Sequence, residues 1–198
     1  QLFAADLSQS KRNGGKYPFY ADAWLPSDAI RGELAEKWVW SDNPLQLTIE
    51  LRKGAMFPEK PGVMKERELT AEDVAFAFNR LATSPKKIAG YFDHVEKVEA
   101  TGKYTVVFTF KYFNAEWDYR FGWGYYSTIT PKEVADAGAT NWKNVNGTGP
   151  FVLSDFVQGS SNTYSKNSIY WDKEKIDGVE YKLPFLDKVV YRTIKDEA

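Results

Sequence analysis

Apolar and polar residues alternate along two stretches of the chain, and this period of two predicts half-buried β-strands. In residues 45–52 a leucine or isoleucine stands at every second position, with polar residues between them. Residues 104–112, YTVVFTFKY, place valine and phenylalanine on one side in the same way. Residues 149–156, GPFVLSDF, and 187–194, DKVVYRTI, are similarly apolar and predict two further strands.

A helical spacing of apolar residues predicts a helix in residues 69–85, LTAEDVAFAFNRLATSP. Thr70 is expected to cap its start, and Asp73, three residues later, forms a variant of the capping box. Pro85 stops the run, because a proline ring cannot continue a helix. The apolar face of this helix is formed by Val74, Ala77, Phe78 and Leu81.

A second, shorter helix is predicted in residues 130–138, TPKEVADAG. Thr130 is expected to cap it, and Pro131 suits the first helical position. Glu133 closes a capping box with the threonine, since it follows three residues later. Gly138 favours the stop at the carboxyl end of this helix.

Strands and helices follow one another in a mixed order rather than in strict alternation. We therefore expect an α+β fold, or an α/β-like fold with mixed sheets. The chain has 198 residues, enough for one ordinary domain or two small ones. It begins without a methionine or a signal region and ends directly after a predicted strand. We expect a processed chain or a fragment of a longer protein.

The composition is that of a soluble globular protein, with 43% hydrophobic and 27% charged residues. Lysine and arginine number 26 against 27 aspartate and glutamate, so no net charge attracts nucleic acid or anionic lipid. No apolar run approaches the roughly 18 residues that a membrane span needs. The absence of cysteine excludes a disulfide scaffold, thiolate metal ligands and a cysteine nucleophile. It is compatible with a periplasmic protein.

The stretch VNGTGPFVL, residues 145–153, permits three interpretations. A phosphate-binding loop of the Walker type needs a lysine and a hydroxyl that are absent, and a dinucleotide fingerprint needs a third glycine opening a helix. Asn146, Gly147 and Thr148 do match the glycosylation pattern, which is a weak signal. A tight turn before a buried strand accounts for the same residues better, so we interpret this stretch as architectural.

The sequence offers no complete catalytic or metal-binding set. His94 is the only histidine, and with scattered carboxylates near it we expect it at the surface. A Ser-His-Asp triad would have to use it, and no G-x-S-x-G motif is present. Residues 172–183 resemble a calcium loop only partly, because the glycine and the closing position are wrong. We expect no catalytic function, no metal and no cofactor.

Glu116 and Asp118 form the best carboxylate pair, in the aromatic segment FNAEWDYRFGWGYY, residues 113–126. Carboxylates flanked by rings are typical of a glycoside hydrolase cleft. In an extended segment, residues two apart would face the same side. The competing interpretation, which we favour, is a loop whose charges are solvated and whose rings pack on a sheet.

The same aromatic segment holds the best candidates for ligand binding. Trp123, Tyr125 and Tyr126 combine large rings with the backbone freedom of Gly124. Rings with polar tips suit a site that grips varied organic ligands. Packing in the core or at its edge explains each residue equally well when it is taken singly.

Several stretches together resemble one known family, the bacterial extracellular solute-binding proteins of the peptide/nickel class. These are the oligopeptide- and dipeptide-binding components of ABC importers. Residues 35–38 are similar to the family's Glu-Ser-Trp type element. Residues 51–54 are similar to the end of its next strand, Leu-Arg-x-Gly, and Phe57 follows as in the family. Residues 70–74 are similar to its helix start, Thr-Ala-Glu-Asp-Val. In place of the family's His-Asp-Gly turn, the chain has Pro58 and a longer charged insertion.

The resemblance continues in the same order along the rest of the chain. VEKVEATGKYTVVFTF resembles the family's next strand pair, and TITPKEV its following helix. GTGPFVLSDFVQG, KNSIYWD and LPFLDKVVYRTIKD resemble its Gly-Thr-Gly-Pro-Phe strand, its Asn-x-x-Tyr-Trp element and the strand into its hinge. The match covers nearly the whole chain from residue 34 onward.

The resemblance implies part of a two-lobe fold of the periplasmic-binding-protein type, with the second lobe missing. Residues 1–33 would start the first lobe, 34–145 form its extra subdomain, and 146–198 return to the lobe's sheet and lead to the hinge. Family members are longer than this chain. The acidic residue that many peptide binders use for the ligand's amino terminus belongs to the missing lobe.

The function implied is periplasmic capture of oligopeptides or similar small solutes for an ABC importer. Its partners are a small-molecule ligand and the membrane permease subunits, and a lipid anchor outside the cytoplasmic membrane is compatible with it. The alternative is a carbohydrate-active protein, either an oligosaccharide or opine-like binder or a hydrolase that uses Glu116 and Asp118. A third interpretation is a binding lobe recruited for protein interaction.

Overall fold

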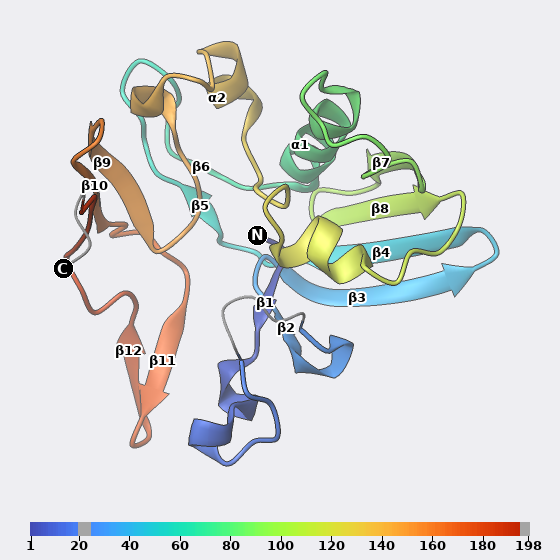
Figure 1. The fold of residues 1–198 in the computed structure, drawn as a ribbon, viewed down its shortest axis with the longest axis horizontal. Coiled ribbons are helices and arrows are strands. Elements are labelled where there is room, and N and C mark those ends of the chain that lie inside the picture. The colour runs from blue at the N-terminus through green and yellow to red at the C-terminus, as the bar shows by residue number, and fades with distance from the viewer. Residues whose placement is uncertain (20–24, 195–198) are drawn as a thin grey trace. The chain divides into compact units, whose positions relative to one another are not determined.

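The computed structural model describes residues 1–19 and 25–194, and the chain divides into two compact units (Figure 1). The first unit consists of Gln1–Arg52 and Thr70–Ile129, and the second of Lys53–Leu69 and Thr130–Ala198. The chain thus enters each unit twice. The units do not coincide with the three segments proposed above, whose assignment to a lobe and a subdomain stays a prediction.

The first unit is built on a four-stranded antiparallel sheet in the order β3-β4-β8-β7. Its strands are β3 (Ala35–Asp42), β4 (Leu45–Leu51), β7 (Val95–Ala100) and β8 (Thr105–Phe110). The two strands predicted from alternation, β4 and β8, are confirmed as its central pair. Their register places Leu47 opposite Phe108, so the buried sides of both strands coincide.

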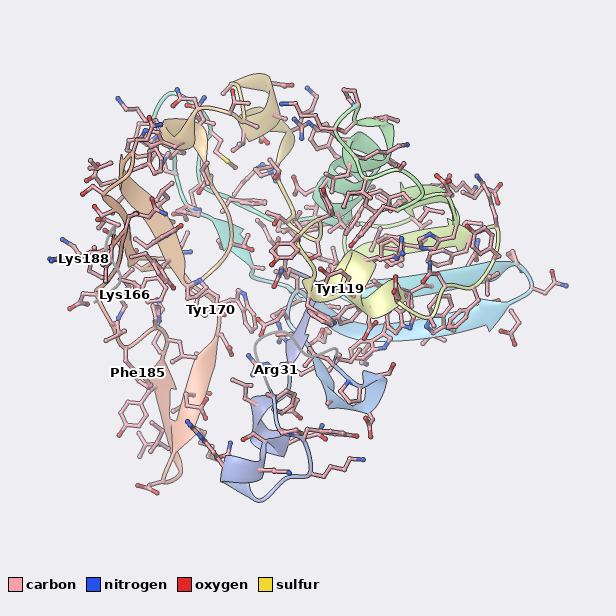
Figure 2. The ribbon with its side chains drawn as sticks, viewed as in Figure 1. Arg31, Tyr119, Lys166, Tyr170, Phe185 and Lys188 are labelled. Atoms are coloured by element: carbon pink, nitrogen blue, oxygen red, sulfur yellow. The ribbon has the colours of Figure 1, made fainter. Side chains whose placement is uncertain are left out.

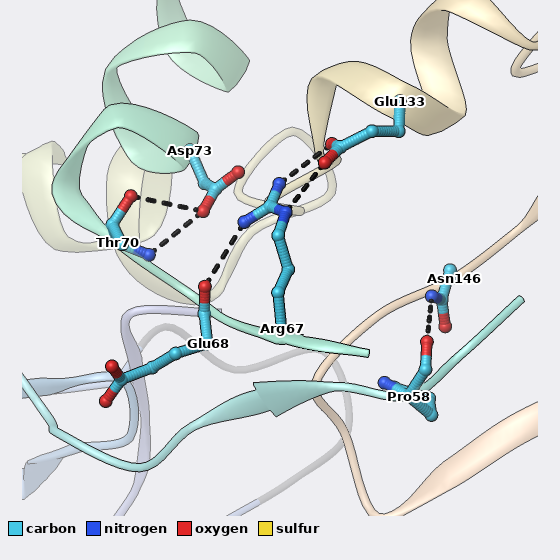
Figure 3. A network of polar contacts seen from close by, with 7 residues as sticks. All are labelled: Pro58, Arg67, Glu68, Thr70, Asp73, Glu133 and Asn146. Carbon is cyan, nitrogen blue, oxygen red and sulfur yellow. Dashed lines mark hydrogen bonds and ion pairs between the residues drawn. The ribbon is translucent and has the colours of Figure 1, made fainter. Parts of the chain in front are cut away.

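Helix α1 (Ala71–Thr83) packs against β7 and β8 and covers part of the sheet. Its predicted capping box is confirmed, since the Thr70 backbone N–H donates to the Asp73 carboxylate at 2.9 Å (Figure 3). The Phe78 ring meets the Phe108 ring edge-on, with centroids 5.2 Å apart. Burying a side chain of this kind stabilises the fold by about 1.5–3 kcal/mol. The rest of the predicted helix face is buried or partly buried: Val74, Ala77 and Leu81.

The remaining elements of the first unit are short. Strand β1 (Phe3–Ala5) pairs with β2 (Ile30–Gly32), and η4 (Tyr119–Trp123) is a single π-helical turn beside β1. Three further turns are 3₁₀-helical: η1 (Leu7–Gln9), η2 (Lys11–Asn13) and η3 (Ser27–Ala29).

The second unit contains a three-stranded antiparallel sheet in the order β13-β10-β9, and two hairpins. The sheet consists of β9 (Phe151–Val157), β10 (Ser161–Lys166) and β13 (Lys188–Arg192). The hairpins pair β5 (Met56–Phe57) with β6 (Arg67–Glu68), and β11 (Lys173–Ile176) with β12 (Val179–Lys182). The strands predicted in residues 149–156 and 187–194 are confirmed as β9 and β13.

The predicted α+β class is confirmed. In the described ranges, the strand pairs of the named sheets run antiparallel. A parallel pairing occurs as an isolated bridge between Ser10 and Tyr17.

Helix α2 (Lys132–Asp136) begins later than predicted, and its start is built differently. Pro131 takes the capping position predicted for Thr130, with an extended backbone. The Glu133 carboxylate accepts hydrogen bonds from Arg67 Nε at 2.7 Å and Nη2 at 2.8 Å (Figure 3). The capping box predicted for Glu133 is therefore wrong, because a fork-shaped guanidinium from β6 competes for its carboxylate. Gly138 follows the helix with a φ of +98°, as expected of a stop.

Residues 145–150 lead into β9, which begins at Phe151, so the strand predicted here is confirmed. The prediction that this strand is buried is wrong, because its side chains are half-buried or exposed. Asn146 is only 8% exposed, and its Nδ2 donates to the Pro58 carbonyl at 2.8 Å (Figure 3). This bond and the Arg67–Glu133 pair tie the two segments of the second unit together. An asparagine used in this way is poorly presented for glycosylation.

Candidate functional site

The aromatic segment that follows β8 contains the π-helical turn η4, whose first residue is Tyr119 (Figure 2). The Gly124 backbone N–H closes the turn on the Tyr119 carbonyl at 2.8 Å. The Asp118 carboxylate accepts from the Tyr119 backbone N–H at 2.9 Å and so caps its start. Turns of this i→i+5 type are rare and occur frequently at functional sites.

Two glycines allow η4 to lie close to its neighbours. A Cβ on Gly122 would fall 2.3 Å from Cδ2 of Phe3, so only glycine fits against β1. A Cβ on Gly124 would fall 2.5 Å from the Tyr119 carbonyl oxygen. The Gln1 side chain also donates to the Trp123 carbonyl at 2.9 Å. The first residues of the chain, Gln1 and Phe3, therefore hold the turn in place.

The three predicted binding residues have different surroundings. Trp123 is partly buried, and its ring meets that of Tyr119 edge-on at 4.7 Å. Tyr126 is also partly buried, with its ring 5.0 Å from that of Tyr91. Tyr125 projects from the segment and is 91% exposed. Two of the rings thus pack on neighbours and one is open to a ligand, and the binding role of all three stays a prediction.

Arg120 organises the segment from within. Its Nε and Nη2 donate to the Glu116 carboxylate at 3.0 and 2.6 Å, and Nη1 donates to the Tyr91 carbonyl. Its guanidinium also lies 4.5 Å over the Tyr91 ring, a cation–π contact. Burial is the main reason that the pKa of Tyr91 rises to about 12. Arg120 therefore connects Glu116 to the ring on which Tyr126 packs, a connection that residue spacing did not reveal.

Glu116 and Asp118 do not form the acid–base pair considered above. The segment is helical at this point, so residues two apart do not face the same side. Glu116 is held by Arg120 in an i,i+4 ion pair, and Asp118 is 4% exposed. Burial raises the pKa of the Asp118 carboxyl, while the Tyr119 backbone N–H and the Trp123 indole lower it. Both carboxylates serve the local fold.

The prediction that His94 lies at the surface is wrong. Its side chain is 1% exposed, directly before β7 and among aromatic rings of β8 and η4. Burial, followed by the positive charge of Arg120, lowers the pKa of His94 to about 4. The sequence showed scattered carboxylates beside it, but the ring is buried against Phe110 and Phe121.

A second candidate surface lies on the sheet of the second unit, as a hollow of about 550 Å³. It is lined by Pro150, Phe151, Asn162, Tyr164, Val189 and Tyr191. Tyr164 and Tyr191 meet edge-on at 5.8 Å. Its size suits a small ligand. These residues are not recognisable as a group in the sequence, because the pairing of β10 with both β9 and β13 brings them together.

In residues 1–19 and 25–194, no group of three or more His, Asp or Glu side chains is placed to hold a metal ion. Within the same ranges, no helix is long and apolar enough to cross a membrane.

Comparison with known proteins identifies the family. The model of the bacterial extracellular solute-binding proteins, family 5 (middle region), matches residues 29–198. The chain belongs to this family. The resemblance seen in the sequence is thereby confirmed, as is the periplasmic-binding-protein class of the fold. The members of this family are extracellular or periplasmic solute-binding proteins rather than enzymes.

Family 5 relatives match most of this chain. The dipeptide-binding protein of Escherichia coli K12 is 29% identical over 203 residues, covering 92% of the chain and 38% of the relative. A probable peptide-binding protein of Agrobacterium fabrum is 30% identical over 158 residues, covering 74% of the chain and 24% of the relative. The chain thus spans about a quarter to two fifths of these relatives.

Solved structures of the family show the same fold. The ABC transporter-associated periplasmic binding protein DppA of Helicobacter pylori, in complex with the peptide STSA, has a TM-score of 0.67 and 30% identity, over 83% of this chain and 34% of that one. A binding protein from A.tumefacien R10, in complex with mannopinic acid, has a TM-score of 0.71 and 25% identity, over 90% of this chain and 34% of that one.

Proposed function

We propose that this family 5 chain is part of the substrate-binding component of an ABC importer, and that it captures short peptides outside the cytoplasm. The observation that carries the proposal is the match to a dipeptide-binding protein over 92% of the chain. A second relative with a peptide-binding name and a solved complex with a tetrapeptide support the same ligand class. None of the relatives named above is a carbohydrate-active enzyme.

The proposed role is binding without catalysis. Glu116 is engaged by Arg120, and Asp118 is buried and caps η4. Neither carboxylate is therefore placed to attack or protonate a glycosidic bond, which needs two carboxyl groups on either side of the substrate. The hydrolase alternative has no support in this geometry.

Within the first unit, the aromatic segment that ends at Tyr126 is the proposed ligand surface. Its exposed ring, Tyr125, offers an apolar face and a hydroxyl to a ligand. The packed rings of Trp123 and Tyr126 would border it. A peptide site also needs main-chain hydrogen bonds, which leave room for varied side chains when the pockets are wide and wet.

The proposed setting follows from the family. The protein would deliver its ligand to the permease subunits of the importer, and a lipid anchor would keep it near them. Residues 34–145 would form a subdomain of the first lobe, and 146–198 would return to the sheet of that lobe. Closure of two lobes on the ligand by a hinge motion would complete the site.

The test uses the native protein, meaning the protein as its own cells make it, purified from a periplasmic fraction. Binding of dialanine and trialanine is measured by isothermal titration calorimetry, with mannopinic acid and a cello-oligosaccharide as competitors. We expect saturable binding of at least one peptide and no turnover. Binding of mannopinic acid alone would replace peptides by another solute class, and cleavage of the saccharide would overturn the proposal.

Residue roles are tested in the same assay with single variants. Tyr125→Ala is expected to weaken peptide binding at least threefold, because it removes the ring that is proposed to contact the ligand. The fold should be unaffected, since the exposed ring has no packing role. Tyr181→Ala, which removes an exposed tyrosine of β12, is the matched control and leaves affinity unchanged. Equal effects of the two variants would place the ligand outside the aromatic segment.

A further inference from the structure

His94 is enclosed in a way that suits only its neutral form. Its side chain is 1% exposed, and neither Nδ1 nor Nε2 has a hydrogen-bond partner in the described part of the chain. The ring stacks on Phe110 with centroids 5.9 Å apart and an interplanar angle of 11°. The rings of Phe121 and Tyr112 lie 5.5 and 6.0 Å away. We call these three rings the His94 cage.

The charges around the cage do not stabilise a proton on His94. Arg120, on η4, faces the imidazole with a positive charge, while Asp93 and Glu116 act on it with opposite sign. Glu116 is already engaged by Arg120, whose Nε and Nη2 both donate to its Oε2 atom. Tyr112 also faces the imidazole, with its ring 6.0 Å away. A buried cation without a hydrogen-bonded carboxylate is strongly disfavoured.

The cage is continuous with the proposed ligand surface. Phe121, which covers one side of His94, is 1% exposed and belongs to η4. The same turn ends at Trp123, and Tyr125 and Tyr126 follow it directly. If the imidazole leaves the cage, Phe121 loses one of its packing partners, while its contacts with Phe108 and Phe110 of the sheet remain, so the packing of η4 is weakened rather than lost.

We propose that His94 is an acid-sensitive lock: protonation of its imidazole opens the His94 cage and loosens η4 together with the aromatic surface that it carries. The effect on ligand release rests on the proposed function, whereas the opening itself does not. A histidine device of this kind needs only a buried neutral ring and a water-exposed alternative position for the charged one.

The direction of the pH dependence follows from linkage. Burial lowers the pKa of His94 in the folded protein to about 4, from an ordinary value of 6.5. The open or unfolded form therefore binds the proton more tightly. Stability contributed by the closed cage is fully present above pH 6.5 and is lost as the pH falls toward 4. The opening equilibrium would shift on the order of a hundredfold across this window.

The first experiment follows urea denaturation of the native protein at several pH values between 7.5 and 4.0, using tryptophan fluorescence. The wild type is compared with His94→Phe, which keeps a ring in the cage but cannot titrate. We expect the wild-type midpoint to fall between pH 6.5 and 4, and that of His94→Phe to change much less. Glu96→Gln, an exposed control two residues away, should follow the wild type.

A second measurement keeps the proposal open to refutation if His94→Phe does not fold. The imidazole carbon resonance of wild-type His94 is titrated by NMR and assigned with His94→Gln. An apparent pKa near 6.5, or identical denaturation profiles of wild type and His94→Phe, would overturn the lock.

Peptide binding separates the two proposals. If the lock and the proposed function both hold, the dissociation constant for dialanine or trialanine rises severalfold from pH 7 to pH 5 in the wild type and not in His94→Phe. If no peptide binds at any pH, the proposed function fails, yet the denaturation and NMR results still decide the lock.

Discussion

The four-stranded sheet of the first unit and the three-stranded sheet of the second have the same kind of strands but differ in how far other elements cover them. In the first unit, Leu47 of β4 and Phe108 of β8 are fully buried, and rings of α1 and η4 pack on Phe108. In the second unit, β9 and β13 keep apolar residues exposed, with Phe156 at 40% and Tyr191 at 64%. Alternation along a strand therefore indicates which residues share a face, but not whether another element covers that face.

The covered sheet has an aromatic centre at Phe108. The Phe108 ring lies 5.2 Å from Phe78 of α1 and 5.0 Å from Phe121 of η4. The sheet and its two covering elements thus meet at one residue. On the open sheet, Tyr191 meets a single ring, that of Tyr164, among the described ring pairs.

The largest expected effect comes from removing this centre. Phe108→Ala should lower the free energy of unfolding of the first unit by about 3–5 kcal/mol, because it leaves a cavity between helix, turn and sheet. Tyr191→Ala, the matched change on the open sheet, should cost about 1 kcal/mol or less, since most of its ring is already in water. Urea denaturation of the native protein measures both, and comparable losses would break the comparison.

A smaller effect is expected where β1 supports η4. Gly122→Ala places a methyl group 2.3 Å from the Phe3 ring, so the turn or the strand must shift. Overpacking of this kind costs about 1–3 kcal/mol. Gly147→Ala is the control, because its Cβ would meet nothing within 4 Å. Thermal unfolding of the two variants should differ clearly, and equal melting temperatures would show that η4 does not depend on β1.

The second unit relies on polar ties, which predicts a weaker and pH-dependent contribution. The Arg67–Glu133 pair is bidentate, but both side chains are about one third exposed, at 32% and 35%. Glu133→Gln should therefore lower stability by less than about 1 kcal/mol. Lys132→Gln, which breaks the more exposed pair with Asp136, should have a still smaller effect.

The sign of the pH dependence distinguishes this pair from His94. Hydrogen bonds from Arg67 lower the pKa of Glu133 below its ordinary value of 4.5. The stability from this pair is present above that value and is lost as the pH falls below it. In a plot of the urea denaturation midpoint against pH, Glu133→Gln should flatten the curve below pH 4.5, whereas His94→Phe should flatten it between pH 6.5 and 4. A flattening at higher pH would contradict the assignment to Glu133.

The smallest effect on stability is expected at the exposed ring of the aromatic segment. Tyr125→Ala should leave the melting temperature unchanged, because the side chain is 91% exposed. Tyr126→Ala should lower it slightly, since its ring packs 5.0 Å from Tyr91. Differential scanning calorimetry tests this order, and destabilisation by Tyr125→Ala would show that its ring packs in solution.

Much of the local structure was predictable from the sequence, whereas the binding role of the aromatic candidates stays a prediction. The start of α1 at Thr70 and Asp73, and the strands β4 and β8, depend on residues within a few positions of one another. Such short-range rules need no knowledge of the rest of the fold. The family could likewise be inferred, because its motifs occur in order along the chain.

The errors share one cause, which is a partner distant in sequence. Glu133 was expected to cap α2, but Arg67, 66 residues earlier, takes its carboxylate. His94 was expected at the surface, but Phe121, 27 residues later, closes over it. The Arg120 network and the hollow on the second sheet were missed for the same reason.

The amino-acid sequence was sufficient to determine the α+β class, the main strands, the capped helix, the aromatic segment and the family, because these follow from local periodicity, caps and ordered motifs. Tertiary structure alone decided which apolar faces are covered, which carboxylate pairs with which guanidinium, and that the His94 side chain is buried. Those outcomes depend on contacts between segments far apart in the chain, where burial and competition for hydrogen bonds outweigh local preference.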